Sequence, residues 1–485
     1  MKFNFKAIIS ILGLLLILNG GFMLLCLPVS IYFGDGQWHA LLLAGALTSL
    51  IGFFAHIFTR KQTNGGLNKR DGYLVVTLGW LGMTIFGTLP FLISGEIPSF
   101  TDAFFETLSG YTTTGASILN DIESMGEGIL MWRSLTQWIG GMGIIVLTVA
   151  ILPILGIGGM QLFVAEAPGV TPDKLKPRIT DTAKRLWLIY LGLTVAEILL
   201  LKIGGMSFFD AINHSLTTMA TGGFSTKQAS IAYFTSPFIQ YVIIIFMFLA
   251  GTNFTLTYFG LHGQLKKVWG NEEFRFYFGF TIGFAVLITF VVYFVTGNSF
   301  EVAFRDSLFQ LVSIVTTTGF VTADYTSWAP LLTVIFFMFM FVGASAGSTA
   351  GGVKVVRHII LLKNSVMELR RQIHPAAVLP VRLNKMAISS EITFNIMAFM
   401  IIYFMVFALG SILISALGYD FNTSVGAVAT CLGNIGPGFG KVGPMDNFAF
   451  ISAPGKWILS ILMLLGRLEL FTVLILFTPY YWTKH

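Results

Sequence analysis

Asp102-Ala-Phe-Phe-Glu-Thr-Leu-Ser-Gly-Tyr-Thr-Thr-Thr-Gly115 is a stretch whose layout returns three more times along the chain. It begins with an acid, continues in helix-compatible composition and ends in a threonine-rich turn with a glycine. The second and third copies are Asp210–Gly223 and Asp306–Gly319, and in all three the acid precedes the glycine by 13 positions. A looser copy, Thr423–Gly436, keeps the spacing but has threonine in place of the acid. Four short helices with glycine turns predict one pore built from four quarters of a single chain.

The composition places the chain in a membrane. Of its 485 residues, 55% are hydrophobic and only 11% are charged, whereas soluble chains carry about 25% charged residues. Cys26 and Cys431 lie in apolar context and cannot form a disulfide framework, and no Cys and His cluster has metal-ligand spacing. The formal charge of +6 comes from basic residues in short loops between apolar runs. We therefore expect a membrane protein that contacts lipids and binds no nucleic acid.

Two apolar runs, Ala7–Phe33 and Trp38–Thr59, predict a helical hairpin at the N-terminus. Each is long enough to cross the hydrocarbon layer, which takes about 20 residues. No small-residue cleavage site follows the first run, so we expect it to be retained. Neither run leads into a glycine turn, and residues 1–60 are therefore interpreted as an accessory hairpin.

From Gly72 onward, a pattern of span, short helix with glycine turn, and span occurs four times. With the N-terminal hairpin, it predicts an all-α polytopic membrane protein with ten crossings and four half-membrane pore helices around one pore. The expected pore modules are residues 61–170, 171–270, 271–378 and 379–485. The leading spans are Gly72–Gly95, Leu186–Gly205, Phe274–Gly297 and Ile392–Gly418. The trailing spans are Trp132–Leu155, Phe238–Phe259, Leu331–Val342 with an interrupted continuation, and Trp457–Tyr481.

Most of the 29 Lys and Arg residues lie at the termini and in the joints between modules. Because cytoplasmic loops carry an excess of Lys and Arg, both termini are predicted to be cytoplasmic and the four turns to open from outside. These residues are Lys2, Lys6, Arg60, Lys61, Lys69, Arg70, Lys174, Lys176, Arg178, Lys184, Arg185, Lys266, Lys267, Arg275, Lys354, Arg357, Lys363, Arg370, Arg371, Arg382, Lys385 and Lys484.

The glycine turns have the chemistry that a partly dehydrated cation requires. A half-membrane helix must end inside the protein, where irregular backbone is tolerated if it lines a wet cavity. Successive carbonyls can replace hydration oxygens, glycine permits the dihedrals that aim them at one axis, and the helix C-terminus adds partial negative charge. The predicted ion-binding filter residues are Thr112, Thr113, Thr114, Gly115, Ala220, Thr221, Gly222, Gly223, Thr316, Thr317, Thr318, Gly319, Asn434, Ile435 and Gly436.

The acids Asp102, Asp210 and Asp306 have two interpretations. Helix capping or matching of the helix dipole in the first turn is favoured, with attraction of cations to an outer vestibule as an additional role. One turn further, Glu106 is replaced by His in the second copy and by Gln in the third. No ring of carboxylates forms, which disfavours a pore for divalent cations.

The turns read Thr113-Thr-Gly-Ala116, Thr221-Gly-Gly-Phe224, Thr317-Thr-Gly-Phe320 and Asn434-Ile-Gly-Pro437. With the four-module layout, they resemble the Trk/Ktr/HKT superfamily of potassium transporters and, within it, the bacterial TrkH-type potassium-uptake subunits. The resemblance covers essentially the whole chain and implies potassium-selective, channel-like conduction across the bacterial inner membrane. In that superfamily a glycine at each filter turn accompanies potassium preference, whereas serine in the first turn accompanies sodium. All four positions are glycine here.

The same resemblance implies partners and ligands. Potassium is expected at the filter carbonyls, and the partners are a cytoplasmic ring of TrkA-type subunits that bind NAD(H) and ATP or ADP, and a second copy of the chain in a homodimer. The chain itself has no strand–helix alternation, Ser/Lys dyad or paired aspartate motif, so neither an organic cofactor nor enzymatic activity is expected. The basic joints, chiefly 354–385, are either the docking surface for the ring or orientation charges that contact anionic lipids.

Ten small residues between Val342 and Val353 interrupt the third trailing span. Such a run cannot hold a stiff helix, because glycine costs about 1 kcal/mol relative to alanine. Close helix packing is one interpretation, and a phosphate-binding loop fails because no Gly-Lys-Ser/Thr follows. We favour a broken helix whose flexible middle lies across the permeation path, where the resemblance also implies a gating loop. These residues are Gly343, Ala344, Ser345, Ala346, Gly347, Ser348, Thr349, Ala350, Gly351 and Gly352.

Arg467 lies within the last predicted span, where a cation costs at least about 2.5–3.5 kcal/mol. Glu469, two residues away, does not share its helix face. Arg467 either pairs with carbonyls or another module, or its charge lies near the pore, where it competes with potassium or holds the 343–352 segment. The second interpretation is favoured, because the Trk branch has a basic residue at the matching place, and Arg467 is counted with the gating residues.

The alternative function is a secondary transporter that couples potassium uptake to protons or sodium. Transporters place paired ionisable residues or broken helices in opposed halves. Here the four repeats point the same way, and Glu197 and Glu469 are the main acids within spans. A gated channel is therefore the leading prediction.

Overall fold

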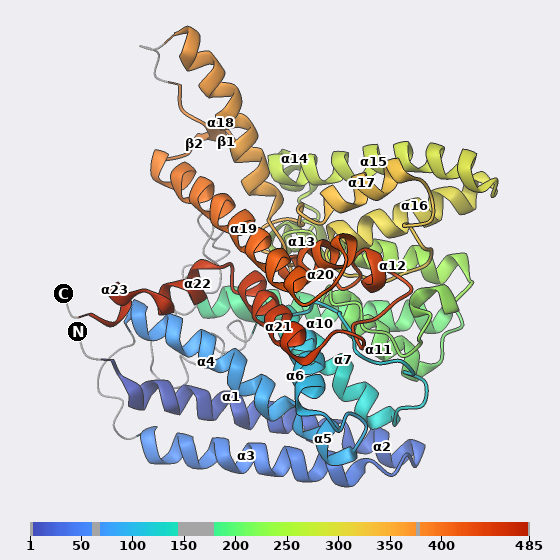
Figure 1. The fold of residues 1–485 in the computed structure, drawn as a ribbon, viewed down its shortest axis with the longest axis vertical. Helices are drawn as coiled ribbons and strands as arrows, with labels where there is room; N and C mark the ends of the chain where they lie inside the picture. Colours follow the sequence, from blue (N-terminus) through green and yellow to red (C-terminus); the bar gives the residue numbers. More distant parts are fainter. Residues whose placement is uncertain (1–2, 61–67, 144–178, 375–378, 484–485) are drawn as a thin grey trace.

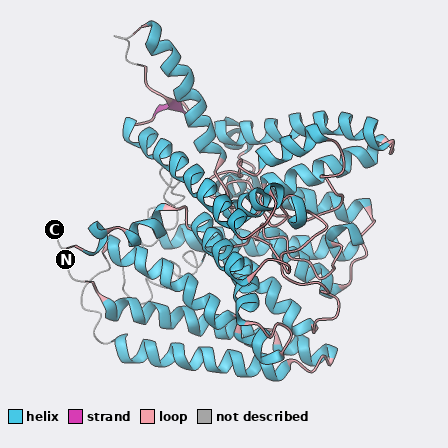
Figure 2. Cartoon of the chain, in the orientation of Figure 1, coloured by secondary structure: helices cyan, strands magenta, loops and turns pink. Residues whose placement is uncertain are grey.

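The computed structural model describes residues 3–60, 68–143, 179–374 and 379–483. Within these ranges the protein is almost entirely helical (Figure 2), and the one sheet is an antiparallel pair, β1 (Arg382–Leu383) with β2 (Met386–Ala387). Some predictions lie outside the described residues. They concern the second half of the span Trp132–Leu155 and the basic residues Lys2, Lys61, Lys174, Lys176, Arg178 and Lys484.

The N-terminal residues form the predicted hairpin (Figure 1). Helix α1 (Phe5–Leu25) is followed at Cys26 by α2 (Leu27–Phe33), and α3 (Trp38–Arg60) returns beside α1. The two long helices approach so closely that a Cβ built on Gly13 would lie 2.6 Å from the carbonyl oxygen of Gly52. Small residues at such a crossing let helices pack in lipid without a hydrophobic driving force.

Leading helices, pore helices and trailing helices then alternate along the chain. The leading helices are α4 (Lys69–Gly87) with α5 (Leu89–Ser94), α10 (Ile179–Ile203), α15 (Glu272–Thr296) and α19 (Ser390–Ala416). The pore helices are α6 (Phe100–Tyr111), α11 (Phe208–Met219), α16 (Phe300–Val315) and α20 (Phe421–Gly433). The trailing helices are α7 (Glu127–Gly141), α12 (Pro237–Ala250) with α13 (Phe254–Leu261), α17 (Pro330–Phe339) with α18 (Val355–Ile373), and α21 (Ala453–Arg467) with α22 (Phe471–Leu474). Short connecting elements are α14 (Leu265–Gly270), α23 (Pro479–Trp482), η2 (Ser230–Tyr233), η3 (Gly440–Val442) and η4 (Ile475–Phe477).

Among the described residues, six helices are long and apolar enough to cross a membrane, or eight if each bent pair is one span. The bent pairs are Pro237–Ala250 with Phe254–Leu261, at 113°, and Ala453–Arg467 with Phe471–Phe477, at 110°. The other two predicted crossings correspond to α7, which reaches the edge of a described range, and α17, an apolar helix of 10 residues. The predicted all-α polytopic membrane fold is confirmed, but the spans expected to be continuous over Phe238–Phe259 and Trp457–Tyr481 are bent.

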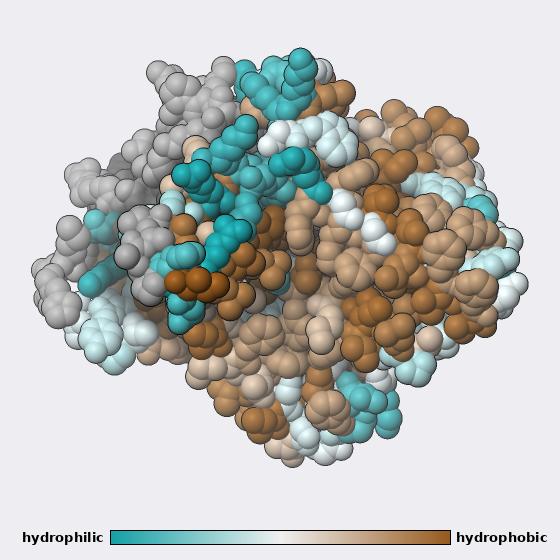
Figure 3. Space-filling model, turned by 90° about the horizontal axis from the view of Figure 1, so that it is seen from above, coloured by the Kyte–Doolittle hydropathy of each residue, from teal (hydrophilic) through white to brown (hydrophobic). Residues whose placement is uncertain are grey.

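The two ends of the chain lie together. The Phe3 ring is 5.5 Å from the Tyr481 ring, and the Tyr481 hydroxyl donates to the carbonyl of Arg70 at 2.7 Å. Figure 1 accordingly places both termini at the same side of the molecule. In the view of Figure 3, hydrophilic side chains gather toward that side, and apolar side chains cover most of the remaining surface in view.

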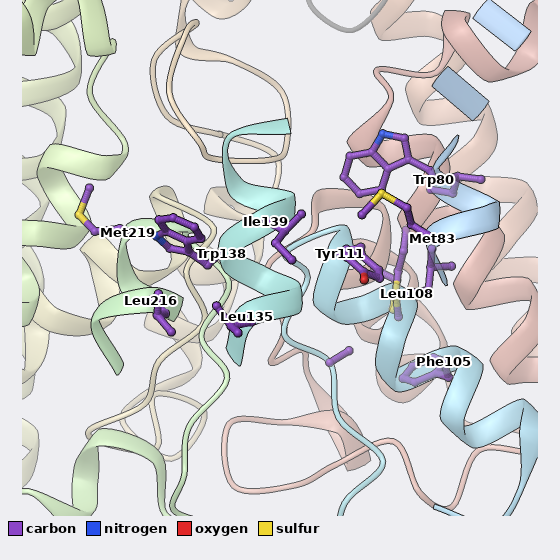
Figure 4. Packing of buried hydrophobic residues seen from close by; sticks show 14 of the residues in the cluster. Trp80, Met83, Phe105, Leu108, Tyr111, Leu135, Trp138, Ile139, Leu216 and Met219 are labelled. Carbon is purple, nitrogen blue, oxygen red and sulfur yellow. The ribbon is translucent and has the colours of Figure 1, made fainter. Parts of the chain in front are cut away.

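Large buried side chains join the first two modules. Figure 4 shows α7 between the pore helices α6 and α11, with Tyr111 and Leu108 toward one side and Trp138 and Leu216 toward the other. Tyr111, Leu108, Trp138 and Leu216 belong to one buried cluster. A trailing helix therefore contacts the pore helices of two modules at once.

We predict that replacing Gly52 by valine destabilises the hairpin, because the new side chain has no space against the backbone of Gly13. Overpacking of this kind costs about 1–3 kcal/mol, which thermal unfolding of the detergent-solubilised protein would register as a lower melting temperature. Gly21→Val on α1 is the matched control, because a Cβ there meets nothing within 4 Å. Equal losses in both variants would contradict the importance of the close crossing.

Candidate ion-conduction site

Each pore helix starts at a side-chain cap. A serine or aspartate oxygen accepts the backbone N–H three residues further on, which satisfies one of the unpaired donors of a helix start. The caps are Ser99, Ser207, Ser299 and Asp420. Hydrogen bonds from Thr423 also hold the pKa of the exposed Asp420 carboxyl below its usual value.

The acids of the repeated stretch are therefore not the caps. Asp102 and Asp210 lie in the first turns of α6 and α11, which agrees with matching of the helix dipole. For Asp306 the prediction is wrong, because α16 begins earlier, at Phe300, and carries Glu301 in its first turn. The fourth copy also has an acid at its helix start. Asp420 caps α20 and lies three positions before Thr423, the residue that the 13-residue spacing matched to the other acids.

Each pore helix ends in the same backbone turn. The residue two positions before the filter glycine has a positive φ, and the glycine itself has a positive φ again. The first set is Thr113 (50°), Thr221 (55°), Thr317 (56°) and Asn434 (54°), and the second is Gly115 (78°), Gly223 (74°), Gly319 (82°) and Gly436 (103°). A left-handed threonine is strained by about 1–3 kcal/mol, so these turns are held by their surroundings.

The hydrogen bonds of the turns repeat as well. The N–H just before the filter glycine returns to a carbonyl five residues earlier, as in a Schellman helix end. These bonds run from Thr114 to Ser109, Gly222 to Thr217, Thr318 to Ser313 and Ile435 to Thr430, at 2.8–3.0 Å. Four segments of different sequence thus adopt one conformation.

The four turns form a closed ring. A Cβ added to any filter glycine would meet a carbonyl oxygen of the next module, and the fourth glycine meets the first module. The pairs are Gly115 with Gly222, Gly223 with Thr318, Gly319 with Ile435, and Gly436 with Thr114, the last at 2.9 Å. The structure therefore brings all the predicted filter residues together around one axis.

A buried polar side chain ties each of the first three pore helices to the chain that follows its turn. The side chain lies nine positions before the filter glycine and bonds a hydroxyl beyond it. The pairs are Glu106 with Ser117 at 2.9 Å, His214 with Ser225 at 2.9 Å, and Gln310 with Thr322 at 3.1 Å. A carboxylate, an imidazole and an amide thus form the same structural link in the three modules, although they cannot form a ring of carboxylates.

The segment 343–352 lies against the turns of the third and fourth modules. The Thr317 hydroxyl accepts the N–H of Gly351 at 2.7 Å, and a Cβ on Gly351 would lie 2.7 Å from that of Asn434. The segment is irregular, as predicted, but it is not loose. Its other bonds include Gly343 N–H to Val353 O (2.7 Å), Ser345 N–H to Gly251 O (3.0 Å), Ala346 N–H to Glu273 Oε1 (2.7 Å), Asn253 Nδ2 to Ala346 O (2.8 Å), Phe254 N–H to Gly347 O (3.0 Å) and Thr349 Oγ1 to Met219 O (3.0 Å).

Arg467, the last residue of α21, joins this segment to the first module. One guanidinium nitrogen donates to the Thr349 carbonyl at 2.8 Å, and another donates to the carbonyls of Gly140 and Gly141 at 2.6 and 3.1 Å. Pairing with carbonyls and contact with the 343–352 segment, offered as alternatives from the sequence, are thus both present. Glu469 forms an ion pair with Arg357 of α18.

A family model described as TrkH, cation transport protein, matches residues 40–484. The chain belongs to the TrkH family. The Trk system potassium uptake proteins TrkH of Salmonella typhimurium and Escherichia coli K12 are each 44% identical to it, over 99% of this chain and all of theirs. The crystal structure of the potassium transporter TrkH from Vibrio parahaemolyticus is similar, with a TM-score of 0.89 and 38% identity over 99% of this chain and all of that one. The resemblance that the turns indicate is confirmed.

Sequence reasoning missed one residue behind the TrkH-family ring. Arg133 of α7 was not among the predicted functional residues, yet its Nε lies 2.7 Å from Glu106 Oε1, and both side chains are almost fully buried. The same guanidinium donates to the Ser225 carbonyl at 3.0 Å and lies 3.6 Å from the centre of the Phe224 ring. Arg133 therefore links the first pore helix to the second turn. A lone arginine within an apolar helix was the signal that could have identified it.

We predict that Arg133→Ala strongly destabilises this TrkH-family protein, because it leaves the Glu106 carboxylate buried without its partner. Removing one member of a buried pair costs about 3–5 kcal/mol, measurable as a lower melting temperature in detergent. Arg371→Ala is the control, since Arg371 and its partner Glu368 are 37% and 53% exposed, and an exposed pair contributes about 0–1 kcal/mol. Similar losses for both variants would refute the stabilising role of the buried pair.

Proposed function

We propose that the chain is a potassium-selective, channel-like conductor for potassium uptake across the bacterial inner membrane. The observation that carries this proposal is the closed ring of four identical backbone turns, each at the C-terminal end of a pore helix. The names of the similar proteins, potassium uptake protein and potassium transporter, support the choice of ion. Potassium is the transported substrate in this proposal.

The ion is proposed to bind at the backbone carbonyls of the filter residues, from Thr112–Gly115, Ala220–Gly223, Thr316–Gly319 and Asn434–Gly436. A positive φ at every second residue turns alternate peptide units, so that successive carbonyls can face the same axis. The four pore helices direct their partially negative C-terminal ends at the ring. Neutral oxygens and helix dipoles favour a monovalent cation that can shed its water.

The test of the filter is Gly115→Ser. A side chain at this position collides with the Gly222 carbonyl, so that carbonyl must rotate or the ring must widen. We expect sodium flux relative to potassium flux to rise on the order of tenfold, equivalent to about 1.4 kcal/mol of lost discrimination, in vesicles that contain the purified protein.

Gly95→Ser is the matched control for that measurement. Gly95 also has a positive φ, of 77°, but a Cβ there meets nothing within 4 Å. An unchanged ion ratio in Gly115→Ser, or an equal change in both variants, would show that the filter is assigned to the wrong residues.

We also propose that the segment Gly343–Gly352 is the gate and that Arg467 holds it in place. The support is its position against Thr317 and Asn434, its irregular backbone, and its bonds to residues of the second, third and fourth modules. Movement of this segment would break its bonds to helix ends, side chains and the turns, while the helices keep their internal hydrogen bonds.

Arg467→Gln should therefore raise potassium flux severalfold in vesicles without any partner protein, because it removes the donor fork that joins Thr349 to Gly140. Arg467→Lys keeps the charge with fewer donors, and we expect an intermediate flux. Shortening 345–352 should have the larger effect. Unchanged flux after shortening would contradict the gating role, and reduced flux in both Arg467 variants would assign the arginine to the conduction path instead.

We propose that a cytoplasmic partner acts on this gate through residues 354–385. Figure 1 shows α18 projecting from the body together with β1 and β2, and its far end combines basic and exposed apolar side chains, Arg370 and Arg371 with Leu369 and Ile373. By resemblance, the partner is a TrkA-type ring that binds NAD(H) and ATP or ADP, and the chain itself forms a homodimer. In this proposal both termini are cytoplasmic. The chain is divided into the accessory hairpin, residues 1–60, and four pore modules, residues 61–170, 171–270, 271–378 and 379–485.

One observation favours the alternative of coupled transport. Glu197 is fully buried on α10 beside Thr218, and among the described residues no hydrogen bond of ordinary geometry reaches its carboxylate oxygens. A buried carboxylate of this kind is a possible proton carrier in a membrane protein. Single-channel recording separates the two functions, because unitary currents that follow the potassium gradient support a channel, whereas flux at a fixed ion ratio supports coupling.

A further inference from the structure

The second turn of the ring differs from the other three in what stands before its filter glycine. Position 222 is glycine, whereas the matching residues of the other turns are Thr114, Thr318 and Ile435. Thr114 and Thr318 each bond a second threonine hydroxyl at the start of their turns, at 2.8 and 2.7 Å. The second turn therefore has neither a side chain nor a hydroxyl pair at this point.

The backbone does not require glycine at position 222. Its φ is not among the positive values of the chain, unlike that of Gly223. What excludes a side chain is Gln137 of α7, because a Cβ on Gly222 would lie 2.5 Å from Gln137 Oε1 and 2.7 Å from Gln137 Nε2. The Gln137 amide of the first module thus occupies the space that a side chain at position 222 of the second module would fill.

Gln137 also bonds the backbone on both sides of Gly223. Its Nε2 donates to the Gly222 carbonyl at 2.6 Å, and its Oε1 accepts the N–H of Phe224 at 3.0 Å. A carbonyl can only accept and a backbone N–H can only donate, so these partners fix which way the amide points. Gln137 is fully buried, so both bonds are shielded from bulk solvent.

The other trailing helices place a methionine at the corresponding position. Counted from the first residue of each helix, Gln137 of α7 corresponds to Met247 of α12, Met340 just beyond α17, and Met463 of α21. A thioether fills space but donates no hydrogen bond. Glutamine therefore occurs beside the one turn that reads Gly-Gly.

We infer that Gln137 is a positioning residue of the filter, which sets the direction of the Gly222 carbonyl by substituting for the missing side chain of the second turn. This inference rests on the proposed function of the ring. The bond from Nε2 and the bulk of the amide together fix the direction of one of the four carbonyls at this level, where the other three turns carry a side chain of their own. The amide thereby tunes ion discrimination from outside the conduction path.

The experiment compares sodium, rubidium and potassium flux in vesicles for the full-length chain and five variants. Gln137→Glu keeps the shape but offers no N–H to the carbonyl, and Gln137→Met introduces the residue of the other modules. Gln137→Ala opens the space, Gly222→Thr fills it against the amide, and Gln137→Ala with Gly222→Thr restores a side chain to the second turn. Gly115→Ser is measured in parallel as the reference for the filter itself.

We expect Gln137→Glu, Gln137→Met and Gln137→Ala each to change the sodium-to-potassium ratio at least fivefold. The double variant should return to within about twofold of the unmodified chain, a recovery that a merely structural role of Gln137 would not produce. Unchanged flux ratios in Gln137→Glu and Gln137→Met, or a double variant with the same ratio as Gln137→Ala, would overturn the inference about Gln137. If the ratio still changes in Gly115→Ser, the proposed filter is retained. An unchanged flux ratio in Gly115→Ser would overturn both the proposed filter and the inference about Gln137.

Discussion

The structure depends on one short-range constraint, the contact between each filter glycine and a carbonyl oxygen of the next turn. No Cβ fits at any of the four places, so each turn approaches the next as closely as only glycine allows. The strain of the left-handed threonines is tolerated because side chains from neighbouring modules hold the turns. Arg133 reaches from the first module to the second, and Asn434 reaches from the fourth to Thr114 of the first, at 2.9 Å.

A second level of organisation lies directly beneath the ring. The trailing helices end or bend there, at Gly141, Gly251, Met340 and Leu468. The last carbonyls of a helix have no partner within it, so this level presents a set of acceptors. Arg467 donates hydrogen bonds to the carbonyls of Gly140 and Gly141, and backbone N–H groups of the 343–352 segment donate to other carbonyls at this level. The breaks in the helices thus create the contacts that retain the irregular segment.

The architecture could be predicted because apolar length and a fourfold repeat are properties of the sequence itself. The helix starts could not be placed as well, since Ser99 and not Asp102 accepts the capping bond. The bends in the second and fourth trailing spans were missed because hydropathy carries no information on direction. Thr113 in a left-handed turn contradicts the usual preference for glycine, and only tertiary support explains it. Arg133 and Gln137 act across module boundaries, which sequence order does not reveal. That potassium binds at the ring and that Arg467 takes part in gating remain predictions.

The ring is made by one chain, and its four quarters are not alike. In an assembly of identical subunits, a single codon change alters every quarter at once, and most such changes are drastic. Here a codon change alters one quarter and leaves three as they were. Asn434, Ile435 and the glycine pair at 222 and 223 show that the quarters have already diverged. A substitution can therefore alter one quarter of the ring while the other three keep their residues.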